Sequence, residues 1–240
     1  MQCRRTAAVA ILFLTTILPA CAAVPAGPAH IAPSGYQPCS PESRLEHGAQ
    51  GRIDAVRNVI LMIGDGMGLN HIWLTRVAAI GPDGRLNMEC MPVSGLITTH
   101  SASHLKTDSA AAATALATGR KTANGMISML PDGTVPKTLL EKAEERGMAT
   151  GLVVTKAVTD ATPAGFGAHN ASRDNQSAIA EDILANGIDV IMGGGRKYWL
   201  PAARGGGRTD GRDLTLEAKR KGYSCITTRS ELDALRTLPV

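Results

Sequence analysis

Short apolar runs alternate with helical stretches along this chain, and this alternation restricts the folds available to it more than any other feature. Nearly continuous apolar runs are typical of buried parallel strands, and the clearest examples lie at residues 56–63 and 150–154. Further strands are predicted at residues 95–99, 188–192 and 223–227. Helices are predicted at residues 69–80, 109–118, 136–146, 177–186, 214–221 and 230–238. The sequence therefore predicts an α/β fold in one domain, with a doubly wound, mostly parallel sheet and helices on both faces.

The composition agrees with a folded globular chain. Hydrophobic residues make up 44% of the sequence and charged residues 19%, while aromatic residues reach only 3%. Aliphatic side chains must therefore fill most of the core. The net charge of +4 is scattered along the chain, so no nucleic-acid partner is predicted.

A serine stands at the start of an alanine-rich helical stretch. Thr107-Asp108-Ser109 leads directly into residues 110–118, and Asp108 is a natural N-cap. The first N–H groups of a helix lack internal partners and carry the positive end of the macrodipole. The Ser109 hydroxyl would therefore lie in an anion-binding position, well placed to attack a phosphate. Taken alone, the motif is equally compatible with an ordinary helix cap.

A glycine-rich turn follows the first predicted strand, and it contains an aspartate. In open α/β sheets ligands bind at the carboxyl ends of strands, where Asp65 of Gly64-Asp65-Gly66-Met67-Gly68 would lie. We interpret Asp65 as a metal ligand. A dinucleotide-binding loop is the alternative, but the glycine spacing differs and an aspartate there would repel a pyrophosphate.

A second group of polar residues follows the strand at 150–154. Asp160 and Thr162 offer the hard oxygen atoms that magnesium prefers. Arg173 offers a planar guanidinium that can hold two phosphate oxygens at once. If these residues stood alone, a capped turn with a surface arginine would be the better explanation of them.

Taken together, these segments resemble the alkaline phosphatase family, in the family's order and at similar intervals. The matching segments are Ile63-Gly64-Asp65-Gly66-Met67-Gly68, Thr107-Asp108-Ser109-Ala110-Ala111, Ala117-Thr118-Gly119-Arg120-Lys121-Thr122, Asp160-Ala161-Thr162-Pro163 and Ala168-His169-Asn170-Ala171-Ser172-Arg173. Gly193-Gly194-Gly195-Arg196 is similar to the family's glycine-rich segment. The resemblance covers roughly residues 54–204 and implies an alkaline-phosphatase-like fold that is incomplete at the C-terminus.

The resemblance implies a phosphomonoesterase that acts on small-molecule phosphate monoesters with two zinc ions and one magnesium ion. Ser109 would be the nucleophile and form a phosphoserine, with its alkoxide stabilised by one zinc. Arg173 would hold the non-bridging phosphate oxygens, and Asp108 would orient Arg173.

The same resemblance assigns the metal ligands. Asp65 would bridge the serine-side zinc and the magnesium, and Thr162 would bind magnesium directly. Asp160 would act directly or through a water, and its carboxylate favours magnesium over zinc at this position.

The remaining zinc ligands and a magnesium-binding glutamate of the family have no match in this chain. None of the six histidines stands in a zinc-ligand context of the family, and His169 matches a position beside the phosphate-binding arginine. His100 and His104 are four residues apart, but residues 94–101 alternate like a strand, so they would not share a helical face.

Two interpretations of this departure stay open. Residues 54–240 are either the N-terminal part of an alkaline phosphatase domain, or a truncated, non-catalytic and surface-anchored remnant that binds phosphate or a partner. In either case we expect the chain alone to be inactive, and we expect the complete enzyme to be a homodimer. A phosphodiesterase or sulfatase of the same superfamily fits the motifs less well, and a serine esterase would need a G-x-S-x-G elbow.

Residues 1–22 are predicted to be an export signal. Arg4 and Arg5 precede an apolar stretch at 7–18 that is too short to span a bilayer. Leu18-Pro19-Ala20-Cys21 resembles a bacterial lipobox, which predicts either a lipid anchor at Cys21 or ordinary cleavage. Residues 23–53 then form a flexible tether. These features predict an exported bacterial protein, periplasmic or membrane-anchored on the periplasmic side or cell surface.

Export also permits disulfides. Once Cys3 is removed and Cys21 is lipidated, Cys39, Cys90 and Cys225 remain. Cys39 with Cys90 is one possible pair, and the sequence leaves the connectivity open.

Overall fold

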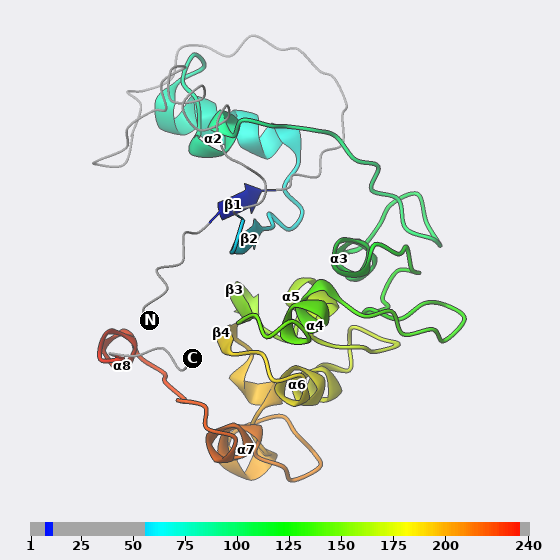
Figure 1. Cartoon of the computed structure of the whole chain (residues 1–240), viewed down its shortest axis with the longest axis vertical. Coiled ribbons are helices and arrows are strands. Elements are labelled where there is room, and N and C mark those ends of the chain that lie inside the picture. Colours follow the sequence, from blue (N-terminus) through cyan, green and yellow to red (C-terminus); the bar gives the residue numbers. More distant parts are fainter. Residues whose placement is uncertain (1–7, 12–55, 236–240) are drawn as a thin grey trace. The chain divides into compact units, whose positions relative to one another are not determined.

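The computed structural model describes residues 8–11 and 56–235 and divides the chain into two compact units (Figure 1). The first unit extends to Thr98, and the second begins at Thr99. The predicted tether, and the predicted export signal apart from residues 8–11, lie outside the described residues. The same is true of Cys21 and Cys39.

In its described residues the first unit pairs two short strands in parallel and also forms an α-helix. Its elements are β1 (Ala8–Ile11), β2 (Val59–Met62), α2 (Leu69–Ile80) and the 3-10 turn η2 (Asn87–Cys90). Glu89 ties η2 back to α2, since Arg76 Nε donates to Glu89 Oε2 at 3.0 Å. Gly81 ends α2 with a φ of 85°, a conformation that favours glycine. Residues 8–11, which belong to the apolar stretch predicted as part of the export signal, form strand β1 in this structure.

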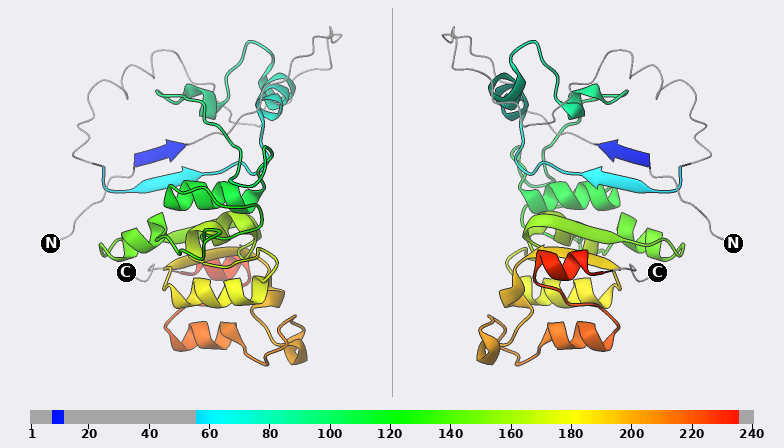
Figure 2. Two further views of the ribbon diagram at one scale, coloured as in Figure 1. Left: turned by 90° about the vertical axis from the view of Figure 1, so that its right-hand side faces the viewer. Right: turned by 90° about the vertical axis from the view of Figure 1, so that its left-hand side faces the viewer.

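The second unit is built around one short central helix. Its elements are α3 (Ser109–Thr118), α4 (Leu139–Glu144), β3 (Gly151–Ala157), α5 (Ala161–Gly167), α6 (Gln176–Ala185), β4 (Val190–Gly194), η3 (Arg196–Tyr198), η4 (Ala202–Arg204), α7 (Leu214–Arg220) and α8 (Arg229–Asp233). Helix α5 packs against α3, α4, α6 and β3 (Figures 1 and 2). Helix α7 packs against α6 on the side away from α5, as both views of Figure 2 show.

Small residues let α3 and α5 approach closely. Ala110 and Ala113 of α3 are buried, and a methyl group added at Gly165 of α5 would lie 2.7 Å from Ala113 Cβ. Ser128 adds a polar link to this contact, because its hydroxyl donates to the Gly165 carbonyl. The alanine-rich sequence of α3 is therefore a packing requirement as well as a helix-forming one.

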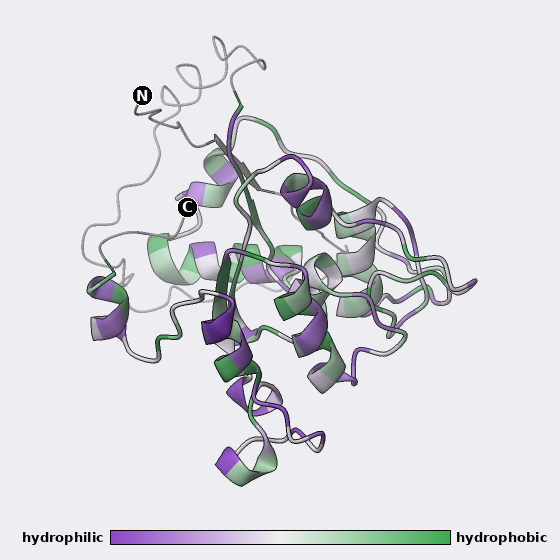
Figure 3. Cartoon of the chain, turned by 60° about the horizontal axis from the view of Figure 1, so that its bottom comes forward, coloured by the Kyte–Doolittle hydropathy of each residue, from purple (hydrophilic) through white to green (hydrophobic). Residues whose placement is uncertain are grey.

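β3 and β4 pair in parallel, with Gly151 opposite Val190, so their carboxyl ends lie at the same edge. This parallel pairing, like that of β1 with β2, confirms the predicted α/β class with parallel strands. Hydrophobic and hydrophilic residues alternate along individual helices in Figure 3, as expected of helices with one face on a core. None of the helices in the described part of the chain combines the length and the apolar character needed to cross a bilayer.

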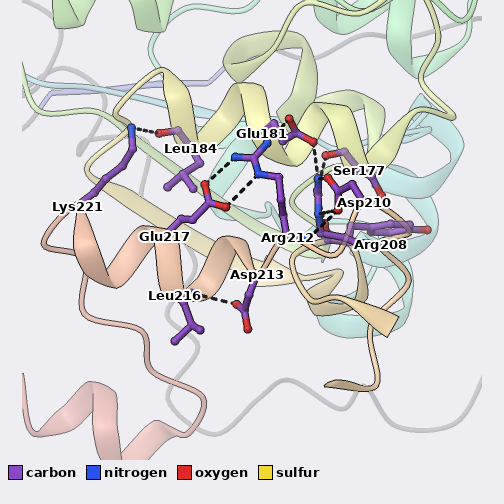
Figure 4. Close-up of polar contacts among 11 residues, drawn as sticks. Ser177, Glu181, Leu184, Arg208, Asp210, Arg212, Asp213, Leu216, Glu217 and Lys221 are labelled. Carbon is purple, nitrogen blue, oxygen red and sulfur yellow. Dashed lines mark hydrogen bonds and ion pairs between the residues drawn. The ribbon is translucent and has the colours of Figure 1, made fainter. Parts of the chain in front are cut away.

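A buried arginine, Arg208, holds the segment at residues 205–210, which follows η4, against α6 (Figure 4). The Arg208 side chain is only 1% exposed, and its Nη1 donates to the carbonyl oxygens of Ser177 at 2.8 Å and Tyr198 at 3.1 Å. Arg208 Nε donates to Asp210 Oδ1 at 3.0 Å, and its Nη2 pairs with both Glu181 and Asp210. One side chain thus joins η3, α6 and the 205–210 segment.

Several predicted elements need correction. Residues 95–99 and 223–227 were predicted as strands, and within the described part of the chain neither segment forms one. The second segment instead closes α7, because Tyr223 N–H donates to the Ala218 carbonyl at 3.0 Å. The helix predicted at 136–146 is shorter, since Thr138 caps α4, and Pro136 lies before it rather than in its first turn.

The chain also contains a helix that the sequence did not predict. Neither a helix nor a strand is predicted at residues 161–167, and they form α5. In the described part of the chain the cysteines differ: Cys90 takes part in a disulfide, whereas Cys225 is free and exposed.

Candidate active site

Ser109 is the first residue of α3, as predicted, and its side chain is half-buried. The preceding residue, Asp108, caps the helix, since its Oδ1 accepts from Ala111 N–H at 3.0 Å. At the other end Gly119 adopts the left-handed conformation with a φ of 73°. Ser109 therefore stands at the N-terminus of a ten-residue helix, whose positive dipole end favours an anion.

The second oxygen of Asp108 accepts from elsewhere in the fold. Asp108 Oδ2 accepts from Gly125 N–H at 3.0 Å and from Arg173 Nη1 at 3.1 Å. Asn124 supports the backbone here, because its Oδ1 accepts from Asp108 N–H at 3.3 Å. Asp108 is thus held by its helix, by the 124–125 turn and by the arginine that the sequence assigned to phosphate.

Arg173 lies between two carboxylates. Its Nη2 donates to Asp160 Oδ1 at 3.1 Å, opposite the bond from Nη1 to Asp108. Its backbone is fixed as well, since Arg173 N–H donates to the Gly125 carbonyl at 2.8 Å. Burial lowers the pKa of Arg173, but Asp108 and Asp160 raise it by more, so the pKa lies above its ordinary value and the guanidinium stays charged.

Asp160 caps α5 and also binds a lysine that the sequence interpretation missed. Its Oδ1 accepts from Ala161 N–H at 2.8 Å, and its Oδ2 lies 2.5 Å from Lys156 Nζ. Burial raises the pKa of Asp160, but Lys156, Ala161 N–H and Arg173 lower it by more, so the carboxyl remains ionised. Lys156 lies in β3 and Asp160 follows that strand, so no helical spacing pointed to this pair in the sequence.

The predicted metal ligands divide between the two units. Thr162 lies in the first turn of α5, two residues after Asp160. Asp65 lies in the first unit, in the turn between β2 and α2, and is exposed. Carboxylate and hydroxyl oxygens suit magnesium, so the chemistry of Asp160 and Thr162 fits a contribution to such a site. Residues 8–11 and 56–235 contain no group of three or more His, Cys, Asp or Glu side chains suited to a metal, so no zinc-ligand set is complete there.

His169 orders the segment that leads to Arg173. Its Nδ1 lies 2.7 Å from the Ser128 carbonyl oxygen, and its Nε2 lies 2.9 Å from Glu141 Oε1. Burial raises the pKa of Glu141, but the Thr138 N–H and His169 lower it by more, so this carboxyl is also ionised. His169 is therefore a structural link between α4 and the Arg173 segment.

His100 and His104, the two other histidines considered from the sequence, have different partners. His100 Nε2 lies 2.6 Å from Lys121 Nζ, and His104 Nδ1 lies 2.7 Å from Ser103 Oγ. Both occupy non-helical backbone, so they do not share a helical face, as expected.

The arrangement is a serine at a helix N-terminus whose capping aspartate also holds an arginine, in an α/β protein. Comparison with known proteins identifies the family of this chain. The family model described as alkaline phosphatase matches residues 56–239. The chain belongs to the alkaline phosphatase family, which confirms the resemblance carried by its motifs.

The relatives support this assignment. The chain is 41% identical to alkaline phosphatase 4 of Bacillus subtilis over 189 residues, which cover 74% of this chain and 39% of the relative. It is 39% identical to the streptomycin-6-phosphate phosphatase of Streptomyces griseus, covering 75% of this chain and 45% of the relative. Among solved structures it is similar to a cold-active alkaline phosphatase from Shewanella sp. The TM-score is 0.65 and the identity 40%, over 72% of this chain and 42% of that one. The chain thus spans less than half the length of the curated relatives it matches.

Proposed function

We propose that this chain carries the nucleophile and the phosphate-binding arginine of an enzyme that hydrolyses phosphate monoesters. One observation carries the proposal: Asp108 caps the helix that begins at Ser109 and, with its other oxygen, holds Arg173. A nucleophile and a phosphate ligand are thereby fixed to the same residue. Phosphoryl transfer depends mainly on such positioning and on charge neutralisation.

In the proposed reaction the Ser109 hydroxyl oxygen bonds to phosphorus as the bond to the leaving-group oxygen breaks. The alcohol departs with a proton, and the phosphoryl group stays on Ser109. Water then attacks phosphorus, the bond to Ser109 Oγ breaks, and inorganic phosphate and the free serine are restored. Arg173 binds non-bridging oxygens in both steps, since its guanidinium has more N–H donors than its two carboxylate bonds use.

We propose magnesium as one cofactor, with Asp160 and Thr162 as its oxygen donors in the second unit, and we propose Asp65 of the first unit as a metal ligand. When bound, it would neutralise charge that develops on the phosphoryl group. A substituted TAB5 alkaline phosphatase, 35% identical with a TM-score of 0.51, has Mg bound in its M3 site. The resemblance also implies two zinc ions. Because the described residues lack a complete zinc-ligand set, no step through zinc is derived from this chain.

Trapping the phosphoserine tests this proposal. The native protein from its source, loaded with zinc and magnesium, would be mixed with 4-nitrophenyl phosphate and quenched in acid, and its peptides would be analysed by mass spectrometry. We expect a phosphoryl group on Ser109 that Ser109→Ala abolishes, and full labelling in the control Ser230→Ala, whose serine lies exposed on α8. Labelling at another residue, or turnover that survives Ser109→Ala, would refute the assignment.

We also propose that the protein is exported and anchored through Cys21 or released by ordinary cleavage. The apolar stretch and the lipobox-like sequence support this proposal. Intact mass of the mature protein distinguishes a lipidated Cys21 from an unmodified N-terminus.

A further inference from the structure

An open pocket lies at the carboxyl ends of β3 and β4. Its volume is about 450 Å³, and it is lined by Lys156, Ala157, Asp160, Gln176, Gly195, Arg196, Lys197 and Tyr198. Ligands of parallel α/β sheets bind at this edge of the strands. Most of these residues come from two segments, one at the end of β3 and one at the end of β4. The second segment includes part of the glycine-rich segment 193–196.

The backbone of this segment shapes the pocket wall. Gly195 has a φ of 85°, and a methyl group there would lie 2.7 Å from Ala157 Cβ. Only glycine therefore lets η3 turn directly against the end of β3. Tyr198 N–H donates to the Gly195 carbonyl at 2.9 Å and closes the turn that presents Arg196 and Lys197 to the pocket.

Hydrogen bonds from outside the pocket hold two parts of its wall, η3 and Gln176. Arg208, which is buried, donates to the Tyr198 carbonyl at 3.1 Å and so fixes the end of η3 to α6. On the α6 side the buried Thr159 hydroxyl donates to Gln176 Oε1 at 2.8 Å. Because the carbonyl oxygen of this amide is thus occupied as an acceptor, its NH₂ group is the part that can donate to a ligand.

The charge of the pocket is positive. Lys156, Arg196 and Lys197 contribute cations, and Asp160 contributes the single carboxylate. That carboxylate already pairs with Lys156 and Arg173. None of the ion pairs in the described part of the chain involves Arg196 or Lys197, and the Lys197 ammonium lies 4.9 Å from the centre of the Tyr198 ring. An anion that entered the pocket would meet positive charge that the fold does not neutralise.

Asp160 places this pocket beside the proposed phosphate site. One of its oxygens binds Arg173 and the other binds Lys156, so Arg173 and the pocket lie on two sides of one carboxylate. We infer that the pocket accepts a second anionic group, a carboxylate or a phosphate, on the leaving group of the ester whose phosphate is bound at Ser109 and Arg173. This inference rests on the proposed function, and it names the substrate class as phosphate monoesters with an anionic leaving group.

Binding of two matched ligands tests the inference without turnover. Phenylphosphonate has one anionic group, and 3-carboxyphenylphosphonate adds a carboxylate to the same ring. Titration calorimetry on the full chain should show that the second ligand binds about threefold to tenfold more tightly, the range for one or two partly exposed charge pairs. The double variant Arg196→Ala/Lys197→Ala should remove this difference and leave phenylphosphonate binding unchanged. Lys197→Arg should keep the difference, as should the control Lys219→Ala, whose exposed lysine lies at the end of α7.

The outcomes separate this inference from the proposed function. Equal affinities in the wild type, or a difference that survives in the double variant, would overturn the inference alone. Inorganic phosphate is the third probe: two bound phosphates in the wild type and one in the double variant would mean a site for free anions, and would overturn the leaving-group assignment. Phenylphosphonate binding that Arg173→Ala leaves unaffected would instead overturn the proposed phosphate site, and with it both proposals.

Discussion

Replacing Arg208 by alanine should destabilise the second unit more than any exposed ion pair could explain. The Arg208 side chain is 1% exposed and donates to the carbonyl oxygens of Ser177 and Tyr198 at 2.8 and 3.1 Å. Its carboxylate partners, Glu181 and Asp210, are 36% and 39% exposed. After the substitution the carboxylates can be hydrated, whereas the two carbonyl groups lose donors in a packed region.

These contacts set the magnitude. A hydrogen bond from a charged group contributes about 1.5–3 kcal/mol, and removing one partner of a buried ion pair costs about 3–5 kcal/mol. Two effects reduce the loss: the carboxylates regain water, and the cost of burying the Arg208 guanidinium disappears. We therefore expect Arg208→Ala to lower the free energy of unfolding by about 2–4 kcal/mol. Arg208→Lys should lose part of that amount, because an ammonium cannot reproduce the planar fork.

Guanidinium unfolding followed by tryptophan fluorescence would measure this loss. The sequence has two tryptophans, and a Trp73→Phe background leaves Trp199, which is 9% exposed and next to Tyr198, as the reporter. Arg204→Ala is the matched control. Arg204 is 50% exposed and pairs only with Asp213 among the ion pairs of the described residues, so it should cost at most about 1 kcal/mol. If the two arginine variants unfold at the same denaturant concentration, the argument from burial is wrong.

Three further predictions follow from the packing, from one pKa and from the metal ligands. Gly165→Ala should lower the free energy of unfolding by about 1–3 kcal/mol, since its methyl group would lie 2.7 Å from a side-chain carbon of α3; Gly95→Ala, with no atom within 4 Å, should change little in the same denaturant titration. Glu141 has a lowered pKa, so its stabilising contribution is complete above pH 4.5, the ordinary value, and disappears as the pH falls through the lower folded value. The melting temperature of Glu141→Gln should therefore lie below that of the wild type at pH 7 and approach it as the pH falls below the folded pKa of Glu141. Glu145→Gln, at an exposed pair, should differ little throughout, and a constant gap for Glu141→Gln would contradict the assignment. Because the described residues hold no group of three or more His, Cys, Asp or Glu side chains that could bind a metal, we expect the chain of 240 residues alone to bind zinc poorly and to hydrolyse 4-nitrophenyl phosphate at background rate. Brisk turnover would disprove this.

Local signals explain the parts of the fold that the sequence predicted. Helix α3 begins and ends as predicted, because Asp108 is an N-cap and Gly119 supplies the left-handed residue that closes the helix. The bounds of α2 were also predicted correctly, with glycines on both sides. The two short segments wrongly assigned as strands were apolar or alternating, but a strand also needs a partner, and periodicity alone does not supply one.

Tertiary contacts explain what the sequence could not predict. Residues 161–167 contain Pro163 and two glycines, a composition that disfavours an isolated helix, and they are helical because Asp160 caps them and every residue of α5 except Thr162 is buried. Burial of Arg208 could not be predicted from the sequence either, since its partners on α6 lie 27 and 31 residues away in the sequence. Lys156 was missed because its role depends on the position of the pocket and not on a motif.

The position of Arg173 in the candidate site depends on two helices, α3 and α5. Asp108 caps α3 and Asp160 caps α5, and both carboxylates hold the same guanidinium, Asp108 through its Oδ2 and Asp160 through the Oδ1 that also forms its cap. Since α3 and α5 pack directly on each other through alanine and glycine, the separation of the two caps is set by the closest helix contact in this unit. Arg173 is therefore positioned by backbone packing rather than by flexible side chains alone. The small residues of α3 therefore matter to the site as much as its charged residues do, because a larger residue in the contact would move one carboxylate relative to the other, and Arg173 with it.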